Sequence, residues 1–148
     1  MILEYSSTEN VALRGAEHRT GRIDWPTFRA RTRDLVSKYD VRGGDDVSPV
    51  RSLSGGNQQK LVLARELGDH PKLLVAENPT RGLDIRATRD VHERLRDAAR
   101  SGSAVVLYSS DLDEVLSLAM RVIVVHAGRV RETTLDRESV GRTMLGLE

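Results

Sequence analysis

Two short apolar runs separated by a helical pattern constrain the fold of this chain more than any other feature. The runs are "KLLVA" at 72–76 and "AVVLY" at 104–108, and each has the length of a β-strand. The segment from about Ile85 to Arg100 lies between them and repeats its apolar residues at helical spacing, namely Val91, Leu95, Ala98 and Ala99. Continuous apolar strands joined by helices are typical of a parallel sheet buried on both faces. The sequence therefore predicts an α/β fold.

The residues after the second run predict a small antiparallel addition to that sheet. Asp111 is placed to cap a short helix that runs through Leu118. The stretch "RVIVVHAGRVRET" is expected to form a hairpin that turns at Ala127 and Gly128, and an amphipathic helix is expected from about Arg137 to Leu145.

The part of the chain before Pro49 is polar and rich in arginine, and its pattern predicts one helix. Asp24 can cap this helix, and Pro26 suits its first position. Apolar residues then recur at helical spacing, at Phe28, Leu35, Val36 and Tyr39. The stretch "VRGGDDVSP" at 41–49 is expected to be a loop.

The composition is that of a globular chain of one domain. Hydrophobic residues make up 39% and charged residues 30% of the 148 residues, and the formal net charge is +1. This charge balance and an aromatic content of 3% argue against a nucleic-acid-binding surface. The absence of cysteine excludes disulfides and thiolate metal sites. We find no transmembrane run and no signal-peptide pattern, so we expect a cytoplasmic location.

The stretch "SLSGGNQQKLVLAREL" at 52–67 opens a good helix with two poor helix formers. Gly55 and Gly56 each cost about 1 kcal/mol relative to alanine inside a helix and less near its end. Glycine at a helix N-terminus leaves the backbone N–H groups accessible to an anion. Ser54 and Gln58 would add side-chain donors. The alternative is that Ser54 is only a helix cap and that the glycines are loop residues in the first turn.

The segment "LSGGNQQK" at 53–60 resembles the signature motif of ABC-type ATPases, in the variant typical of importers for sugars and nucleosides. Further segments resemble other parts of this family in the expected order. "PTRGLD" at 79–84 matches the end of the Walker B region and the D-loop, and "LYSSDLDEVL" at 107–116 matches the switch region. "RVIVVHAGRV" matches the terminal hairpin, and the stretch from "TENVAL" to "SPVRSLSGG" resembles the helical subdomain.

The resemblance implies the C-terminal portion of an ABC-type P-loop ATPase domain. Residues 1–52 would form the helical subdomain, and residues 53–148 would form the signature helix and an incomplete, mainly parallel sheet. A P-loop, G-x-x-x-x-G-K-S/T, is absent from the chain, because Lys38, Lys60 and Lys72 all follow residues other than glycine. We therefore expect a fragment, a truncated product or half of a split protein, derived from the second of two tandem domains.

Two positions differ from the family pattern. The family has Asp-Glu before Pro-Thr, where the aspartate faces Mg²⁺ and the glutamate orients the attacking water, whereas this chain has Glu77 and Asn78. Glu77 is a candidate Mg²⁺ ligand or simply a polar residue that ends a strand. Ser110 stands where a switch histidine is expected. The resemblance therefore implies a catalytically degenerate half-site and no ATPase activity of the chain alone.

The signature, in contrast, is complete. In the family each signature helix closes on the γ-phosphate of ATP held by the partner domain, so ATP and Mg²⁺ would be bound only in the assembled complex. The resemblance assigns this contact in trans to Ser54, Gly55, Gly56 and Gln58, with Asp84 of the D-loop at the same interface. Arg81 and Arg86 flank the D-loop as partner contacts or as solvated side chains.

The expected partners are a second nucleotide-binding domain, membrane permease subunits and, indirectly, a solute-binding protein, with no nucleic acid. The complex would sit at the inner face of the cell membrane. Two alternatives are a non-transport ABC module of the DNA-repair or translation type and a non-functional fragment. The four histidines have no metal-ligand spacing.

Overall fold

The structure is a computed structural model that describes residues 1–147. The chain divides into two compact units. The first unit contains Met1–Leu74 and Thr80–Val105, and the second contains Val75–Pro79 and the residues from Val106 onward. The predicted α/β class is confirmed.

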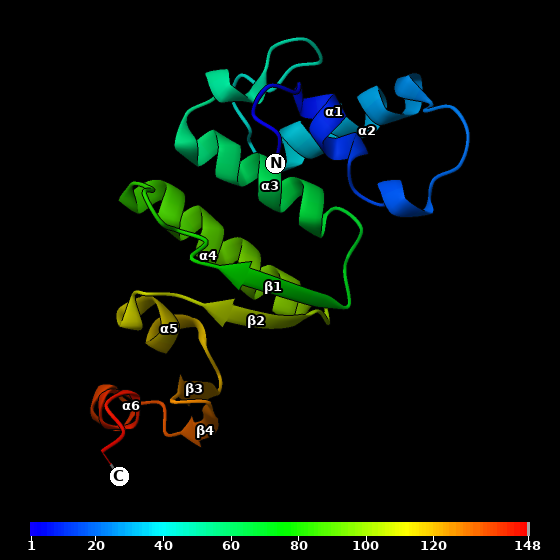
Figure 1. The fold of residues 1–148 in the computed structure, drawn as a ribbon. Coiled ribbons are helices and arrows are strands. Elements are labelled where there is room, and N and C mark those ends of the chain that lie inside the picture. The colour runs from blue at the N-terminus through cyan, green and yellow to red at the C-terminus, as the bar shows by residue number, and fades with distance from the viewer. Residues whose placement is uncertain (148) are drawn as a thin grey trace. The chain divides into compact units, whose positions relative to one another are not determined.

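The first unit is built mainly from helices packed around α3 (Figure 1). Its helices are α1 (Ser7–Ala12), η1 (Ala16–His18), α2 (Trp25–Lys38), η2 (Val50–Ser52), α3 (Gly55–Leu67) and α4 (Ile85–Arg100). Helix α3 contacts α1, α2 and α4. Its buried face consists of the four apolar residues that recur at helical spacing, Leu61, Leu63, Ala64 and Leu67.

The short helix α1 was not predicted, although the sequence contains its signal. Ser6 caps the helix by accepting a hydrogen bond from the Glu9 N–H at 3.3 Å, and the Glu9 carboxylate accepts one from the Ser6 N–H at 2.8 Å. This reciprocal pair is a capping box, in which Ser or Thr is followed three residues later by Glu or Gln. The helix is difficult to predict from the sequence, because it is short and its residues do not form a long apolar repeat.

The predicted helices 24–39 and 85–100 are confirmed as α2 and α4. Asp24 caps α2 through the Thr27 N–H, and Pro26 occupies the second helical position because the helix begins at Trp25. The Arg94 guanidinium of α4 stacks on the Tyr39 ring at 4.6 Å from its centroid. One detail of the predicted α4 face is wrong, because Ala99 is exposed. The buried face of the helix consists of Val91, Leu95 and Ala98, and Ala99 lies outside it.

Strands β1 (Leu73–Glu77) and β2 (Ala104–Tyr108) pair with each other. They run parallel, since the Ala104 N–H donates to the Lys72 carbonyl at one end and the Asn78 N–H donates to the Tyr108 carbonyl at the other. The prediction that the strands are buried on both faces is wrong for the described residues. Side chains alternate along β1, where Leu73 and Val75 are 57% and 65% exposed, because the described chain covers only one face.

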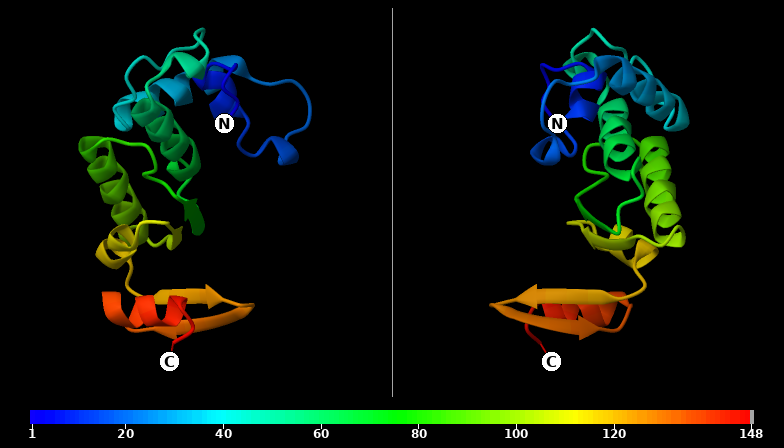
Figure 2. Two further views of the ribbon diagram at one scale, coloured as in Figure 1. Left: turned by 60° about the vertical axis from the view of Figure 1, so that its left-hand side comes forward. Right: turned by 90° about the vertical axis from the view of Figure 1, so that its right-hand side faces the viewer.

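The second unit ends in a hairpin supported by a helix (Figure 2). Its elements beyond β2 are α5 (Leu112–Leu118), β3 (Val122–His126), β4 (Arg129–Thr133) and α6 (Arg137–Met144). The turn lies at Ala127 and Gly128, as predicted, and both residues have positive φ. Val122 and Val124 of β3 pack with Val140 of α6 to form a small core.

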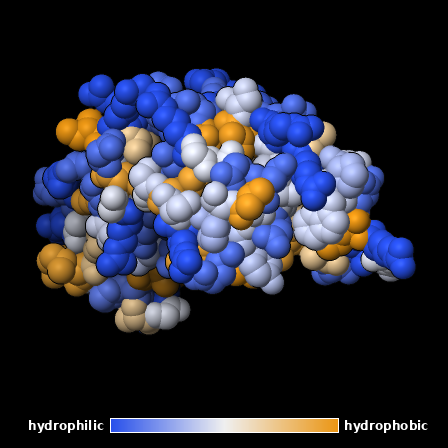
Figure 3. Space-filling view, turned by 90° about the horizontal axis from the view of Figure 1, so that it is seen from above, coloured by the Kyte–Doolittle hydropathy of each residue, from blue (hydrophilic) through white to orange (hydrophobic). Residues whose placement is uncertain are grey.

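The face drawn in Figure 3 is mostly hydrophilic, and its apolar spots are small and separate. None of the helices formed by residues 1–147 has both the length and the apolar character that a membrane span requires.

Candidate functional site

The N-terminus of α3 is open on the side of its first two residues. The Ser54 hydroxyl caps the helix by accepting hydrogen bonds from the backbone N–H of Asn57 at 3.4 Å and from its side-chain amide at 2.9 Å. No described residue accepts a hydrogen bond from the N–H of Gly55 or Gly56. These two groups are therefore available to a ligand at the positive end of the helix dipole.

The space around the two glycines differs. A Cβ atom on Gly55 would have no neighbour within 4 Å, whereas one on Gly56 would lie 3.4 Å from the Ala87 Cβ of α4. Packing within the chain therefore does not explain why position 55 is glycine. At position 56 it gives only a partial explanation, through the contact with Ala87. Both residues have ordinary negative φ, so backbone conformation does not require glycine either.

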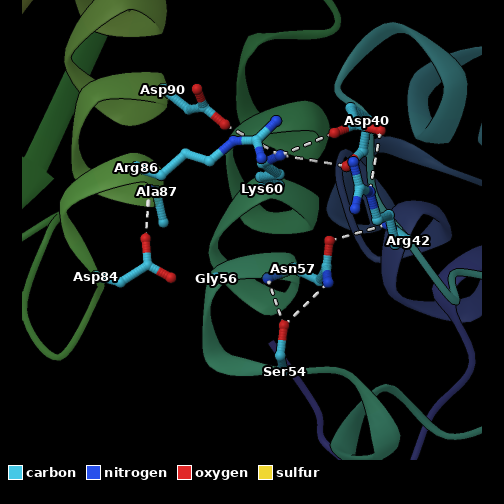
Figure 4. Close-up of a pocket in the computed structure, with 10 residues that line it drawn as sticks. All are labelled: Asp40, Arg42, Ser54, Gly56, Asn57, Lys60, Asp84, Arg86, Ala87 and Asp90. Carbon is cyan, nitrogen blue, oxygen red and sulfur yellow. Dashed lines mark hydrogen bonds and ion pairs between the residues drawn. The ribbon is translucent and has the colours of Figure 1, made fainter.

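A pocket of about 150 Å³ lies between the start of α3, the start of α4 and the loop that follows α2 (Figure 4). It lies entirely within the first unit. Its lining residues are Asp40, Arg42, Ser54, Gly56, Asn57, Lys60, Asp84, Arg86, Ala87 and Asp90. Two helix N-termini thus border one pocket, since Ser54 caps α3 and Asp84 caps α4.

Most of the charged side chains in the pocket are paired. The Lys60 ammonium lies 3.1 Å from the Asp90 carboxylate and 3.2 Å from the Asp40 carboxylate. The Arg42 guanidinium lies 3.6 Å from Asp40. The hydrogen bond from Lys60, together with the charges of Lys60 and Arg42, lowers the pKa of Asp40 below its ordinary value.

Arg86 is the exception among the pocket cations. It is exposed, and it makes no hydrogen bond or ion pair with another residue of the described chain. Its side chain extends from α4 across the pocket in Figure 4. The positive charge of Arg86 is therefore available to a ligand, whereas that of Lys60 is neutralised by its two carboxylates.

Two of the sequence-predicted residues have local roles in this structure. The Gln58 amide nitrogen donates to the Leu53 carbonyl at 3.0 Å, and Gln58 does not line the pocket. The Asp84 carboxylate accepts a hydrogen bond from the Ala87 N–H at 2.8 Å, which makes it the N-cap of α4. Asp84 nevertheless lines the pocket with Ser54 and Gly56, so three of the five predicted residues gather there.

The second unit contains the three positions expected to carry chemistry. Glu77 is exposed at the end of β1. Asn78 has a φ of +43°, its N–H donates to the Tyr108 carbonyl at 2.7 Å, and its side-chain oxygen accepts a hydrogen bond from the Ser110 N–H at 2.9 Å. Among residues 1–147 there is no group of three or more His, Asp or Glu that could hold a metal ion, so Mg²⁺ at Glu77 would need ligands from another source.

The fold is shared with known ATPase cassettes. No protein-family model matches the chain. A dimeric structure of MJ0796, described as a bacterial ABC transporter cassette, matches with a TM-score of 0.73 and 25% identity over 93% of this chain and 60% of that one. A second dimeric structure of MJ0796, in a post-hydrolysis state bound to ADP and Pi, matches with the same values.

The curated relatives are more similar in sequence. The nucleoside import ATP-binding protein NupA of Lactococcus lactis is 38% identical over 99% of this chain, and the guanosine import ATP-binding protein NupO of Bacillus subtilis is 35% identical over 99%. The glucose import ATP-binding protein TsgD13 of Haloferax volcanii is 46% identical over 84%. The chain is a homologue of the ATP-binding proteins of ABC importers. It spans 30%, 30% and 24% of the lengths of NupA, NupO and TsgD13, respectively.

Within this ABC homologue, sequence reasoning missed several residues of the pocket. Asp40, Arg42 and Asn57 received no role, and Arg86 was interpreted as a partner contact or a solvated side chain. Arg42 and Asn57 are joined by a 2.8 Å hydrogen bond from the Arg42 N–H to the Asn57 side chain, 15 positions away. No sequence signal announces such a contact, because it depends on how the loop after α2 packs against α3.

Proposed function

We propose that this chain supplies the signature helix of an ATP-binding domain in an importer of a sugar or a nucleoside. In this proposal Ser54, Gly55 and Gly56 bind the γ-phosphate of an ATP molecule that the partner domain holds. The observation that carries the proposal is the open N-terminus of α3, where the N–H groups of Gly55 and Gly56 have no acceptor in the described chain. The names of the relatives, which are nucleoside, guanosine and glucose import proteins, support the solute class.

The two helix N-termini that border the pocket favour an anion at this position. Both helix N-termini carry partial positive charge from unpaired backbone N–H groups. The side chains of the pocket carry no net charge, because the carboxylates of Asp40, Asp84 and Asp90 balance the three cations Arg42, Lys60 and Arg86. Arg86 is the cation whose charge no carboxylate of the described residues pairs with directly. Gly55 has no side chain to keep a phosphate away from the backbone.

The half-site formed by the chain's own residues is proposed to be inactive in hydrolysis. The carboxylate that would orient the attacking water is replaced by Asn78, and the side-chain oxygen of Asn78 already accepts the Ser110 N–H. Ser110 brings a hydroxyl but no positive charge to the switch position. ATP and Mg²⁺ would therefore be bound through the assembled complex, with Glu77 as the candidate metal ligand of this half-site.

The partners in this proposal are a second nucleotide-binding domain, which provides the P-loop for the composite site, and the membrane permease subunits. The solute-binding protein would act indirectly through the permease. The chain would lie on the cytoplasmic side of the membrane as a peripheral part of the transporter.

The test is Gly55→Glu in the assembled transporter that contains this chain, with ATP hydrolysis as the readout. A carboxylate at this position would compete with the γ-phosphate for the N–H groups of α3, so hydrolysis at the composite site should be lost. Gly141→Glu is the matched control, because Gly141 also lies in a helix and an added Cβ there has no neighbour within 4 Å. Unchanged hydrolysis in Gly55→Glu would contradict the proposed contact.

A further inference from the structure

Asn78 connects the ends of two neighbouring strands through its backbone and its side chain. It follows β1 directly, and its N–H continues the pairing by donating to the Tyr108 carbonyl at the end of β2. Its side-chain oxygen then accepts the Ser110 N–H at 2.9 Å, although the two residues are 32 positions apart in the sequence. The side chain therefore extends the ladder by one hydrogen bond beyond the point where the strands end.

The backbone of Asn78 fits this role. Its φ of +43° lies in the left-handed region, where asparagine is tolerated much better than most residues. In this conformation the short amide side chain reaches the Ser110 N–H. Ser110 is itself exposed, and its N–H donates to the side-chain oxygen of Asn78.

We propose that Asn78 is a positioning residue that holds the segment after β2 against the end of β1 without any nucleotide. This contact is called the Asn78–Ser110 bridge below. The bridge fixes the position of Ser110 and leads directly into Asp111, the N-cap of α5. The hydrogen bond of the bridge is independent of the proposed function, whereas any effect of the bridge on ATP hydrolysis rests on that function.

The geometry of the bridge predicts that glutamate would hold Ser110 less well than Asn78 does in this chain. Glutamate lacks the tolerance of asparagine for the left-handed region, and its oxygen atoms lie one bond farther from the backbone. Asn78→Glu would therefore break the bridge and release the segment around Ser110, rather than simply add a carboxylate. A single Asn78→Glu change is expected to produce no gain in ATP hydrolysis in the assembled transporter.

The experiment measures amide hydrogen exchange of Ser110 by NMR in the 148-residue chain. In the unmodified chain the Ser110 amide should exchange about five-fold more slowly than in an unstructured peptide, as expected for one hydrogen bond. Asn78→Gly tolerates the backbone conformation but removes the acceptor, so it should abolish this protection. Asn78→Asp retains an acceptor and should keep it. Amides of the β3–β4 hairpin in the same spectra are the internal control.

Two results would overturn the proposal: an unprotected Ser110 amide in the unmodified chain, or undiminished protection in Asn78→Gly. If a variant also loses the protection of its β3–β4 hairpin amides, the variant is unfolded, and the protection of Ser110 in the unmodified chain alone tests the proposal. Failure of the proposed function gives a different result. If the signature helix does not bind ATP, Gly55→Glu has no effect on hydrolysis, and the hydrogen exchange of Ser110 in the unmodified chain stays slow. A gain of hydrolysis in Asn78→Glu with Ser110 still protected would show that the bridge does not depend on asparagine.

Discussion

The ammonium of Lys60 lies 3.1 Å from the carboxylate of Asp90 and thereby joins α3 to α4 beside the open helix N-terminus. The Lys60 side chain is only 17% exposed, and it also donates to the backbone carbonyl of Asp40 in the loop that follows α2. One lysine of α3 thus contacts both α4 and the loop that follows α2. We infer that it helps to hold the two helix N-termini at the spacing that forms the pocket.

Replacing this lysine should destabilise the first unit. Lys60→Met keeps most of the apolar stem but leaves Asp40 and Asp90 without their common cation. We expect a loss of about 1 kcal/mol in the free energy of unfolding, because the lysine is partly buried while its partners are more exposed. Urea unfolding measures this loss. Lys72→Met, at an exposed lysine, is the control, and equal effects of the two changes would contradict the role of Lys60.

Removing Arg86, the pocket cation without a partner in the described part of the chain, should affect binding rather than folding. Arg86→Ala is expected to weaken ATP-dependent association with the partner domain about ten-fold, since a charge-assisted hydrogen bond to phosphate is lost. Sedimentation experiments measure the association constants of the unmodified chain and of Arg86→Ala with the partner domain at low and high salt. The difference between the two constants should be smaller at high salt, because salt screens the charges. Arg89→Ala, on the same helix but outside the pocket, should bind as the unmodified chain does. A comparable loss in both variants would point to general electrostatics instead.

The stability of the second unit should depend on pH through the cap of α6. Hydrogen bonds from the Ser139 N–H and from Thr134 lower the pKa of Asp136 from 3.8 to about 2. Because the pKa is lower in the folded state, the ionised carboxylate contributes stability that is complete above pH 3.8 and is lost as the pH falls toward 2. Acid should therefore destabilise α6 within this window.

Asp136→Asn tests this window, because asparagine also caps helices but does not titrate. Its stability in urea should fall less steeply between pH 3.8 and 2 than that of the unmodified chain. Glu138→Gln, in the first turn of the same helix, is the control. An identical acid profile for Asp136→Asn and the unmodified chain would show that this carboxylate is not responsible.

Local sequence signals were sufficient for most of the elements. The caps at Asp24 and Asp111 are found where expected, as is the turn at Ala127 and Gly128. Ser54 caps α3, as the alternative interpretation of that residue had it. Each depends on residues within one turn or one hairpin. Helix α1 was missed for lack of an apolar repeat, and the burial of β1 was overestimated because an apolar run does not reveal how many layers cover it.

The candidate site was only partly predictable. The signature residues drew attention to Ser54, Gly55 and Gly56 because glycines in the first turn of a good helix need an explanation. The ion pairs of Lys60 carried no such signal, and neither did the lack of a partner for Arg86 among residues 1–147, since both depend on how α4 packs against α3.

By itself, the sequence of this protein determined where most of its helices and strands lie, which helix opens with two glycines, and which family the chain resembles. These properties depend mainly on residues close together in the chain, whose local preferences can be read before the fold is known. Only the tertiary structure decided that two helix caps share one pocket and that Asn78 accepts the Ser110 N–H across 32 positions. Such contacts form only after packing has brought distant segments together.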